Sequence, residues 1–117
     1  PVPYHDIAGL EYVTKHSIVP IMSDESCFNS KDALRLVERR AVDYLNIKLM
    51  KCGGIREALK INAICEAAGI ECMLGCMVEE SNLGITAAAS LGAAMKNITR
   101  ADLDATLYYR KSRDLVL

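Results

Sequence analysis

The sequence predicts an α/β fold in which parallel strands alternate with helices, and three observations support this prediction. Short apolar runs recur along the 117 residues, and most are followed by a stretch with helical periodicity. The resulting order is a helix, then strand and helix three times, then a strand, which implies parallel strands joined by right-handed crossovers. The composition is 51% hydrophobic and 25% charged, as in an ordinary globular domain. We therefore expect one continuous unit without a linker.

The first part of the chain is expected to contain two helices with a strand between them. Apolar residues spaced three to four positions apart mark the helices, and a short apolar run marks the strand. Asn29 or Ser30 is expected to cap the second helix, with Asp32 in its first turn. The expected bounds are 6–16 for the first helix, 18–22 for the strand and 30–40 for the second helix.

The segment 44–57 carries the strongest signal in the chain and is expected to begin as a strand. Its apolar residues recur at every second position, as Leu45, Ile47 and Leu49. Lys48 interrupts the alternate face late in that strand, and Gly53 and Gly54 follow before a helical pattern begins. A charged side chain at the end of an apolar strand is poor packing chemistry, but it is suited to an active site built from strand ends.

The second half repeats the pattern of strand and helix. Gly69 is expected to end one helix. The run that follows it is almost continuously apolar, as in a strand buried on both faces, and the next helix is rich in alanine and glycine, which favours close packing. The last strand is expected to carry Asp102 and Asp104 on one face. The expected bounds are 55–68, 70–78, 81–95 and 98–107; the tail, 108–117, has no clear partner.

Charged residues lie at the ends of the four predicted strands. They are Asp24 and Glu25, Lys48 and Lys51, Glu79 and Glu80, and Asp102 and Asp104. If the strands are parallel, these side chains gather at one end, the catalytic face of a (β/α) barrel. Carboxylates there suit Mg²⁺, and a lysine beside a metal can have its pKa lowered and serve as a base. A solvated loop explains any one pair, but the repetition at equivalent positions favours a site.

Composition argues against several other classes of protein. A net charge of −1 does not favour nucleic acid or anionic membranes as partners, and no membrane span or signal peptide is evident. Five cysteines without a Cys-x-x-Cys pair indicate reduced thiols in a cytoplasmic protein. The two histidines lie early in the chain, which disfavours both a zinc site and a Ser-His-Asp mechanism.

Three segments resemble the enolase superfamily, which includes mandelate racemase, and within it the muconate-lactonizing-enzyme subgroup. They are PIMSDES (20–26), NIKLMKCGG (46–54) and GCMVE (75–79). The resemblance implies a partial (β/α) TIM-type barrel that contains about the last four strands. Residues 1–117 would then be the C-terminal part of the barrel domain, with the N-terminal capping domain and the first barrel strands absent from this chain.

The resemblance also implies roles for single residues. Asp24 matches the last of three Mg²⁺ ligands, and Lys48 matches an acid/base catalyst on the sixth barrel strand. Glu25, Lys51 and Glu79 are possible supporting residues around them, and Lys51 is expected in the turn. The other ligands and the opposing lysine have no counterpart in this chain, so the fragment by itself is expected to be inactive.

Asp102-Leu-Asp104 resembles the pair of aspartates with which dipeptide epimerases of the L-Ala-D/L-Glu type bind the ammonium group of a dipeptide. The implied reaction is a Mg²⁺-dependent 1,1-proton transfer through an enediolate. Muconate cycloisomerase, o-succinylbenzoate synthase and N-acylamino acid racemase remain alternatives, as does a non-catalytic truncated fragment. We expect a dipeptide substrate, a homo-oligomer when the protein is complete, and self-association of the fragment through its exposed barrel edges.

Overall fold

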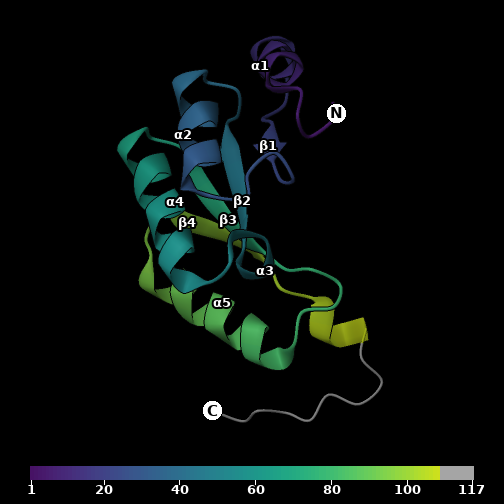
Figure 1. Ribbon diagram of the computed structural model, residues 1–117, viewed down its shortest axis with the longest axis vertical. Coiled ribbons are helices and arrows are strands. Elements are labelled where there is room, and N and C mark those ends of the chain that lie inside the picture. Colours follow the sequence, from purple (N-terminus) through teal and green to yellow (C-terminus); the bar gives the residue numbers. More distant parts are fainter. Residues whose placement is uncertain (109–117) are drawn as a thin grey trace.

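The sheet contains four parallel strands in the order β1-β2-β3-β4, as the sequence predicted (Figure 1). The structure, a computed structural model, describes residues 1–108. The strands are Met22–Ser23 (β1), Tyr44–Lys48 (β2), Glu71–Gly75 (β3) and Ile98–Asp102 (β4). The helices are Ile7–His16 (α1), Ser30–Glu38 (α2), Leu49–Cys52 (α3), Ile55–Ala67 (α4) and Asn82–Ala94 (α5), followed by the 3₁₀ helix Ala105–Tyr108 (η1). Among the described helices, none combines the length and the apolar composition needed to cross a bilayer.

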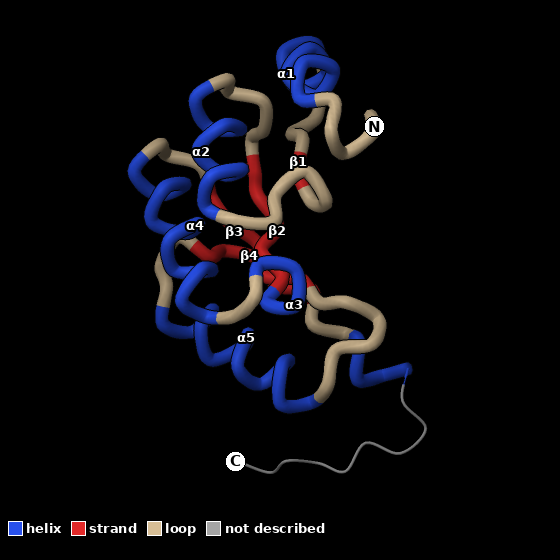
Figure 2. Tube along the Cα trace, viewed as in Figure 1, coloured by secondary structure: helices blue, strands red, loops and turns tan. Residues whose placement is uncertain are grey.

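The hydrophobic core lies between one face of the sheet and the helices. Figures 1 and 2 show α2, α4 and α5 along the same side of the strands. Side chains alternate along a strand, so β2 and β3 each direct every second residue toward these helices. The buried residues of this face are Leu45, Ile47, Cys72 and Leu74. The opposite face therefore carries Lys48 and the other polar residues of β2.

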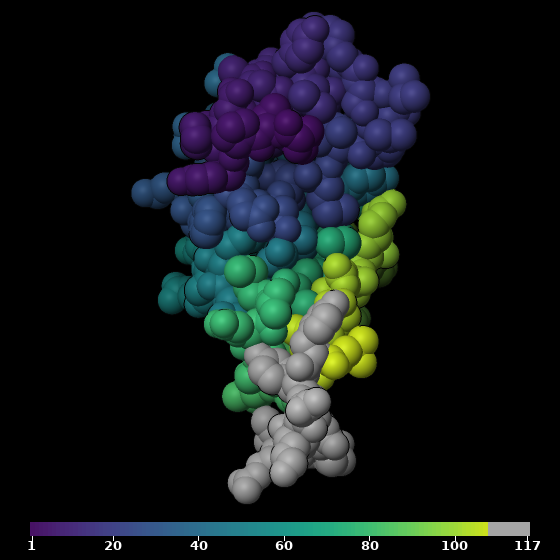
Figure 3. All heavy atoms as spheres, turned by 90° about the vertical axis from the view of Figure 1, so that its right-hand side faces the viewer, coloured from purple at the N-terminus to yellow at the C-terminus, as the bar shows by residue number. Residues whose placement is uncertain are grey.

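Successive strand–helix units lie side by side along the longest axis. In the space-filling view of Figure 3 the chain runs from its N-terminal part at one end to residues near 108 toward the other. Strand β2 pairs with β3, and β3 pairs with β4, each in parallel register. This arrangement is that of consecutive units of a (β/α) barrel, in which helices form the outer layer.

Two helix ends agree with the predicted capping residues. The Asn29 side chain accepts hydrogen bonds from the backbone N–H groups of Lys31 and Asp32, at 2.9 and 3.1 Å. Gly69 follows α4 with φ of 72°, a left-handed conformation that glycine adopts without strain. These local signals define where α2 begins and where α4 ends, without any tertiary contact.

The first predicted strand was misplaced. The sequence predicted residues 18–22, whereas β1 is Met22–Ser23, and Ile18 and Val19 are 101% and 61% exposed. Ser17 and Val19 bond to each other in a tight turn, and Pro20 has no N–H to give to a strand partner. The apolar run therefore forms a surface loop, and pairing begins two residues before Asp24.

The later strands are shorter than predicted, and one helix was missed. Strand β3 ends at Gly75 and not at Val78, because the loop after it closes with a bond from the Glu80 N–H to the Met77 carbonyl. Cys72 and Leu74 are buried on one face, whereas Glu71 and Met73 on the other face are partly exposed, so β3 is not buried on both faces within the described chain. Strand β4 ends at Asp102 and not at residue 107, since η1 begins at Ala105. The helix α3 lies where the sequence predicted only a turn.

Glu57 links the first turns of α2 and α4, and this contact predicts a pH dependence. Its Oε1 accepts from the Ser30 N–H at 2.9 Å and from the Ser30 hydroxyl at 2.6 Å, and Lys60 lies 2.9 Å from Oε2. These partners, with the Ser30 hydroxyl the largest contributor, lower the pKa of Glu57 to about 2. Because the folded pKa lies below the unfolded one, the contact contributes stability above pH 4.5 and loses it as pH falls toward 2.

We therefore expect Glu57→Gln to flatten the acid limb of the stability curve. Between those two pH values, unfolding of the parent protein should take up about one more proton than unfolding of the variant. Urea unfolding at a series of pH values measures this difference. Glu66→Gln, at an exposed position of the same helix, is the matched control. Equal acid limbs in Glu57→Gln and the parent would contradict the assignment.

Candidate active site

The carboxyl ends of the strands bring most of the predicted site residues to one edge of the sheet. Asp24 directly follows β1, and Lys48 and Asp102 are the last residues of β2 and β4. Lys48 pairs in register with Gly75 of β3, and Gly75 pairs with Asp102. Residues in one such row direct their side chains to the same face of the sheet. Lys48 and Asp102 thus share a face, with a glycine between them.

A carboxylate held by two lysines lies at the centre of this edge. Nζ of Lys48 is 2.7 Å from Oδ2 of Asp24, and Nζ of Lys51 is 2.7 Å from Oδ1. Lys51 also donates to the backbone carbonyl of Asp24 and, at 3.2 Å, to that of Asn46. The side chain of Lys51 is 3% exposed, so this residue lies in the interior and not on the surface of a turn.

The ion pairs set the charge state of the cluster. Burial disfavours ionisation of Asp24, but hydrogen bonds from Lys48 and Lys51 outweigh it and hold the pKa of this carboxyl below its usual range. Burial likewise disfavours the Lys48 ammonium, yet Asp24, with a smaller effect of Glu25, raises the pKa of Lys48. In the described arrangement the pKa of Lys48 is thus raised, because the neighbouring carboxylates outweigh burial, whereas the lowered pKa considered from the sequence was that of a lysine beside a metal.

Asn46 is a site residue that the sequence did not single out. It lies two positions before Lys48 on the same face of β2 and is buried, and its Oδ1 has no hydrogen-bond partner within residues 1–108. A Cβ on Gly75 would lie 2.6 Å from that oxygen. Any larger residue at Gly75 would therefore displace Asn46 and crowd the space between Lys48 and Asp102. The signal that could have found Asn46 is its period-two spacing from Lys48.

The two C-terminal aspartates are close in sequence but do not share a strand. Asp102 ends β4, whereas Asp104 lies in the turn before η1, so the predicted placement of both on one strand face is wrong. Asp104 accepts a long contact from the Cys76 thiol, 3.7 Å from its Oδ1. Both aspartates are exposed. The turn brings Asp104 toward the loop after β3 and leaves Asp102 in the row of Lys48.

The remaining predicted residues lie at different distances from the cluster. Glu25 is exposed, with its Oε1 3.8 Å from Nζ of Lys48. Glu79 is also exposed, and within residues 1–108 the ion pairs of Lys48 and Lys51 go to Asp24 and Glu25 and not to it. Its neighbour Glu80 is 1% exposed and accepts from the Met77 N–H at 3.2 Å. Glu80 therefore shapes the loop after β3, while Glu79 lies outside the cluster.

The donor set fits part of a magnesium site. Carboxylate oxygens of Asp24 and Glu25 are hard ligands of the kind Mg²⁺ prefers. Within residues 1–108, however, no three aspartate, glutamate, histidine or cysteine side chains gather closely enough to hold a metal ion. The described residues would therefore supply only a share of the ligands, and Asp24 is better placed than Glu25 because it directly follows β1 and is half-buried, whereas Glu25 is exposed.

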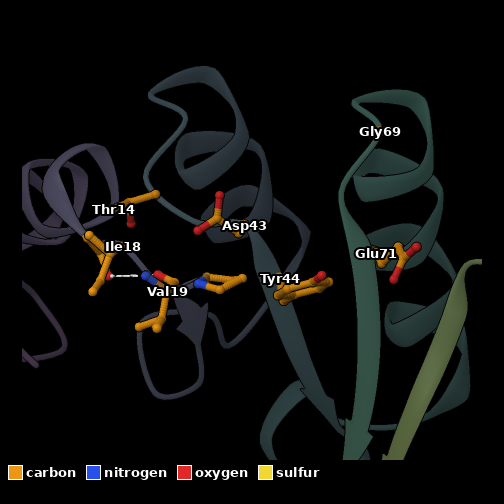
Figure 4. A pocket seen from close by; sticks show the side chains of 9 residues that line it. Thr14, Ile18, Val19, Asp43, Tyr44, Gly69 and Glu71 are labelled. Carbon is orange, nitrogen blue, oxygen red and sulfur yellow. Dashed lines mark hydrogen bonds between the residues drawn. The ribbon is translucent and has the colours of Figure 1, made fainter.

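A hollow of about 410 Å³ lies at the opposite end of the strands (Figure 4). Thr14, Asp43 and Tyr44 line it, together with Ile18 and Val19 of the exposed loop. These residues lie at the amino ends of β2 and β3, the face of a (β/α) barrel that serves stability and not catalysis. The predicted site residues Asp24, Lys48 and Asp102 lie at the other end of the strands, so the candidate site is the carboxyl edge.

Comparison with known proteins identifies relatives along nearly the whole chain. Residues 1–116 match the family described as Enolase C-terminal domain-like. A hydrophobic dipeptide epimerase from Enterococcus faecalis is 68% identical over 106 residues, which cover 91% of this chain and 30% of that enzyme. An L-Ala-D/L-Glu epimerase from Bacillus subtilis is 53% identical over 107 residues, 92% of this chain and 29% of that enzyme. This chain thus spans about 30% of the length of these relatives.

Solved structures agree with the sequence relatives. A dipeptide epimerase from Enterococcus faecalis, complexed with Mg and the dipeptide L-Leu-L-Tyr, superposes with a TM-score of 0.94 at 64% identity, over 97% of this chain and 32% of that one. An N-succinyl Arg/Lys racemase from Bacillus cereus superposes with a TM-score of 0.92 at 37% identity, over 96% of this chain and 30% of that one. With the parallel sheet and the match over residues 1–116, these likenesses show that the chain belongs to the enolase C-terminal domain-like family.

Proposed function

We propose that this chain is the C-terminal part of the barrel domain of a Mg²⁺-dependent dipeptide epimerase. The observation that carries the proposal is the row at the carboxyl edge, where Lys48, ion-paired to Asp24, faces the same side as Asp102 across Gly75. The similarity to a hydrophobic dipeptide epimerase at 68% identity supports it. The capping domain and the other strands of the barrel would come from residues outside this sequence.

Asp24 and Lys48 carry the proposed proton transfer. Asp24 would hold the metal, and Mg²⁺ when bound would stabilise the negative charge that develops on the substrate carboxylate. Lys48 would return a proton to the substrate α-carbon from one face as the ammonium, and as the neutral amine, after losing its own proton, it would remove the α-proton from that face. Its ammonium is anchored 2.7 Å from Asp24, so the proton-transferring group is held next to the ligand that fixes the substrate carboxylate. A second lysine, from the rest of the barrel, would act on the other face.

Asp102 and Asp104 would hold the free ammonium group of the dipeptide. Two strand spacings separate Lys48 from Asp102, which places their backbones about 10 Å apart with both side chains on one face. A dipeptide fits between them, with its α-carbon near Lys48 and its amino terminus near Asp102. Carboxylates are the natural partners of a desolvated ammonium group. Lys48 would therefore mark the site of reaction, and Asp102 would favour a substrate with an unblocked amino terminus.

We expect Asp102→Asn and Asp104→Asn each to lower the specificity constant for dipeptides by orders of magnitude in the full-length enzyme. Removing one partner of a desolvated ammonium–carboxylate contact costs about 2–5 kcal/mol. Turnover of an N-acylated amino acid, which has no charge to pair, should change much less. Steady-state kinetics with Mg²⁺ and both substrate classes measure the difference.

The same assay separates epimerase from racemase activity. A wild-type enzyme that prefers N-acylated amino acids would replace the epimerase proposal with an N-acylamino acid racemase, the alternative favoured by the 37% identity to an N-succinyl Arg/Lys racemase. If both variants lose the same factor in specificity constant for both substrate classes, the aspartates stabilise the loop and do not bind the ammonium group. A library of dipeptides would then identify the preferred side chains.

We further propose that residues 1–117 by themselves are inactive and associate through their open sheet edges. They hold one candidate lysine base and, in residues 1–108, too few carboxylates to form a metal site. Strand β4 is an outer strand, and four of its five residues are exposed. Such an edge offers unpaired backbone groups to another strand. In the complete enzyme the neighbouring barrel strands would cover it, and we expect that enzyme to be a homo-oligomer.

A further inference from the structure

Lys51 is a buried lysine whose ammonium group is fully hydrogen-bonded. It belongs to α3, yet its Nζ reaches across to the end of β1 and back to β2. It donates to three acceptors, namely Oδ1 of Asp24, the carbonyl of Asp24 and the carbonyl of Asn46. An ammonium group has three donors, so this set uses all of them. At 3% exposure, the side chain has exchanged water for these partners.

A buried ammonium group is costly unless its charge and donors are satisfied. The three acceptors of Lys51 are therefore a condition for its burial, and they bind the ends of two neighbouring strands together. The bond to the backbone carbonyl of Asp24 fixes the main chain at that residue, and the bond to Oδ1 fixes the rotation of its carboxylate. The remaining oxygen, Oδ2, faces Lys48, whose side chain is 13% exposed.

We propose that Lys51 is a positioning residue that orients Asp24 for metal binding, a role that rests on the proposed function of Asp24. Lys51 anchors the main chain and one oxygen of Asp24, and the other oxygen is left for the metal ion. When the metal binds, the more exposed Lys48 would leave Oδ2 of Asp24, and the metal ion would take its place. The two lysines three residues apart thus have separate tasks, one holding the ligand and one serving the substrate.

Charge alone predicts the opposite effect, which makes the inference testable by its sign. A cation beside a metal site repels the metal, so removal of Lys51 would tighten binding if only its charge mattered. Removal of an orienting partner instead weakens metal binding by about 10- to 100-fold. Lys51 has three bonds and almost no exposure, and we expect the loss of orientation to dominate.

The test is the binding of Mn²⁺ to the metal-free full-length enzyme, followed by electron paramagnetic resonance without substrate. The Mn²⁺ dissociation constant of Lys51→Met should rise by about tenfold or more. Lys60→Met removes an exposed lysine that pairs with Glu57 and is the matched control, with an unchanged dissociation constant. Lys51→Arg, which keeps a cation and donors at this place, should restore much of the affinity.

The outcomes separate this inference from the proposed function. Unchanged or tighter Mn²⁺ binding in Lys51→Met would overturn the positioning role, provided that Asp24→Asn abolishes binding. Unchanged binding in Asp24→Asn would instead remove Asp24 as a ligand, and the proposed function with it. If Lys51→Met does not fold, judged by circular dichroism, Lys51→Ala removes the same three hydrogen bonds with a smaller side chain, and wild-type binding in that variant equally overturns the inference.

Discussion

Asp24→Asn is expected to abolish Mg²⁺-dependent turnover in the full-length enzyme. The substitution keeps the shape of the side chain but removes the charge that would hold the metal and that now pairs with Lys48 and Lys51. Loss of one metal ligand and of the orientation it gives should lower kcat/KM by a factor on the order of 10³ or more. Turnover measured as a function of Mg²⁺ concentration would show whether added metal restores any of it.

Glu25→Gln is the matched control for Asp24. Glu25 is the next residue, is exposed, and lies 3.8 Å from Lys48. A change of less than about tenfold is expected there, because exposed ion pairs contribute little. If Asp24→Asn keeps near-normal activity and metal affinity, the ligand lies elsewhere, and comparable losses in both variants would point to the net charge of the edge and not to one carboxylate.

Lys48→Ala is expected to stop exchange of the substrate α-proton with D₂O from one enantiomer only. Lys48 lies at the end of β2 and approaches the site from one side of the sheet edge. A base on one face acts on one enantiomer, so exchange from that enantiomer should fall by at least about 10³-fold while the other continues. Proton NMR of each enantiomer incubated with the full-length enzyme and Mg²⁺ measures both rates.

Lys51 provides the contrast for this experiment. If it orients Asp24, Lys51→Ala should slow exchange from both enantiomers alike, because the metal serves both directions of the reaction. Exchange lost from one enantiomer in Lys51→Ala, and kept in Lys48→Ala, would mean that the two lysines have been assigned the wrong way round. Unchanged exchange from both enantiomers in Lys48→Ala would exclude it as a base.

The order and type of most elements could be predicted from local patterns. Alternation in 44–49 predicted β2, and Asn29 and Gly69 marked the ends of helices α2 and α4. These signals act within a few residues, through backbone conformation and capping bonds. Strand ends were less predictable. Ile18 and Val19 have the composition of a strand but lie exposed beside Pro20, and Asp104 lies past the end of β4 because η1 follows at once.

The sequence by itself determined that parallel strands would direct Asp24, Lys48 and Asp102 to a common edge, since period-two patterns and crossover handedness are enough for that. Only the tertiary structure decided which charges meet. Lys51 and Asp24 are 27 positions apart, and their contact depends on the packing of α3 against two strand ends. The same holds for Glu79 and Glu80, where loop closure buries the second and leaves the first in water. Burial and pairing of charges follow from register and packing between distant segments, which no local pattern encodes.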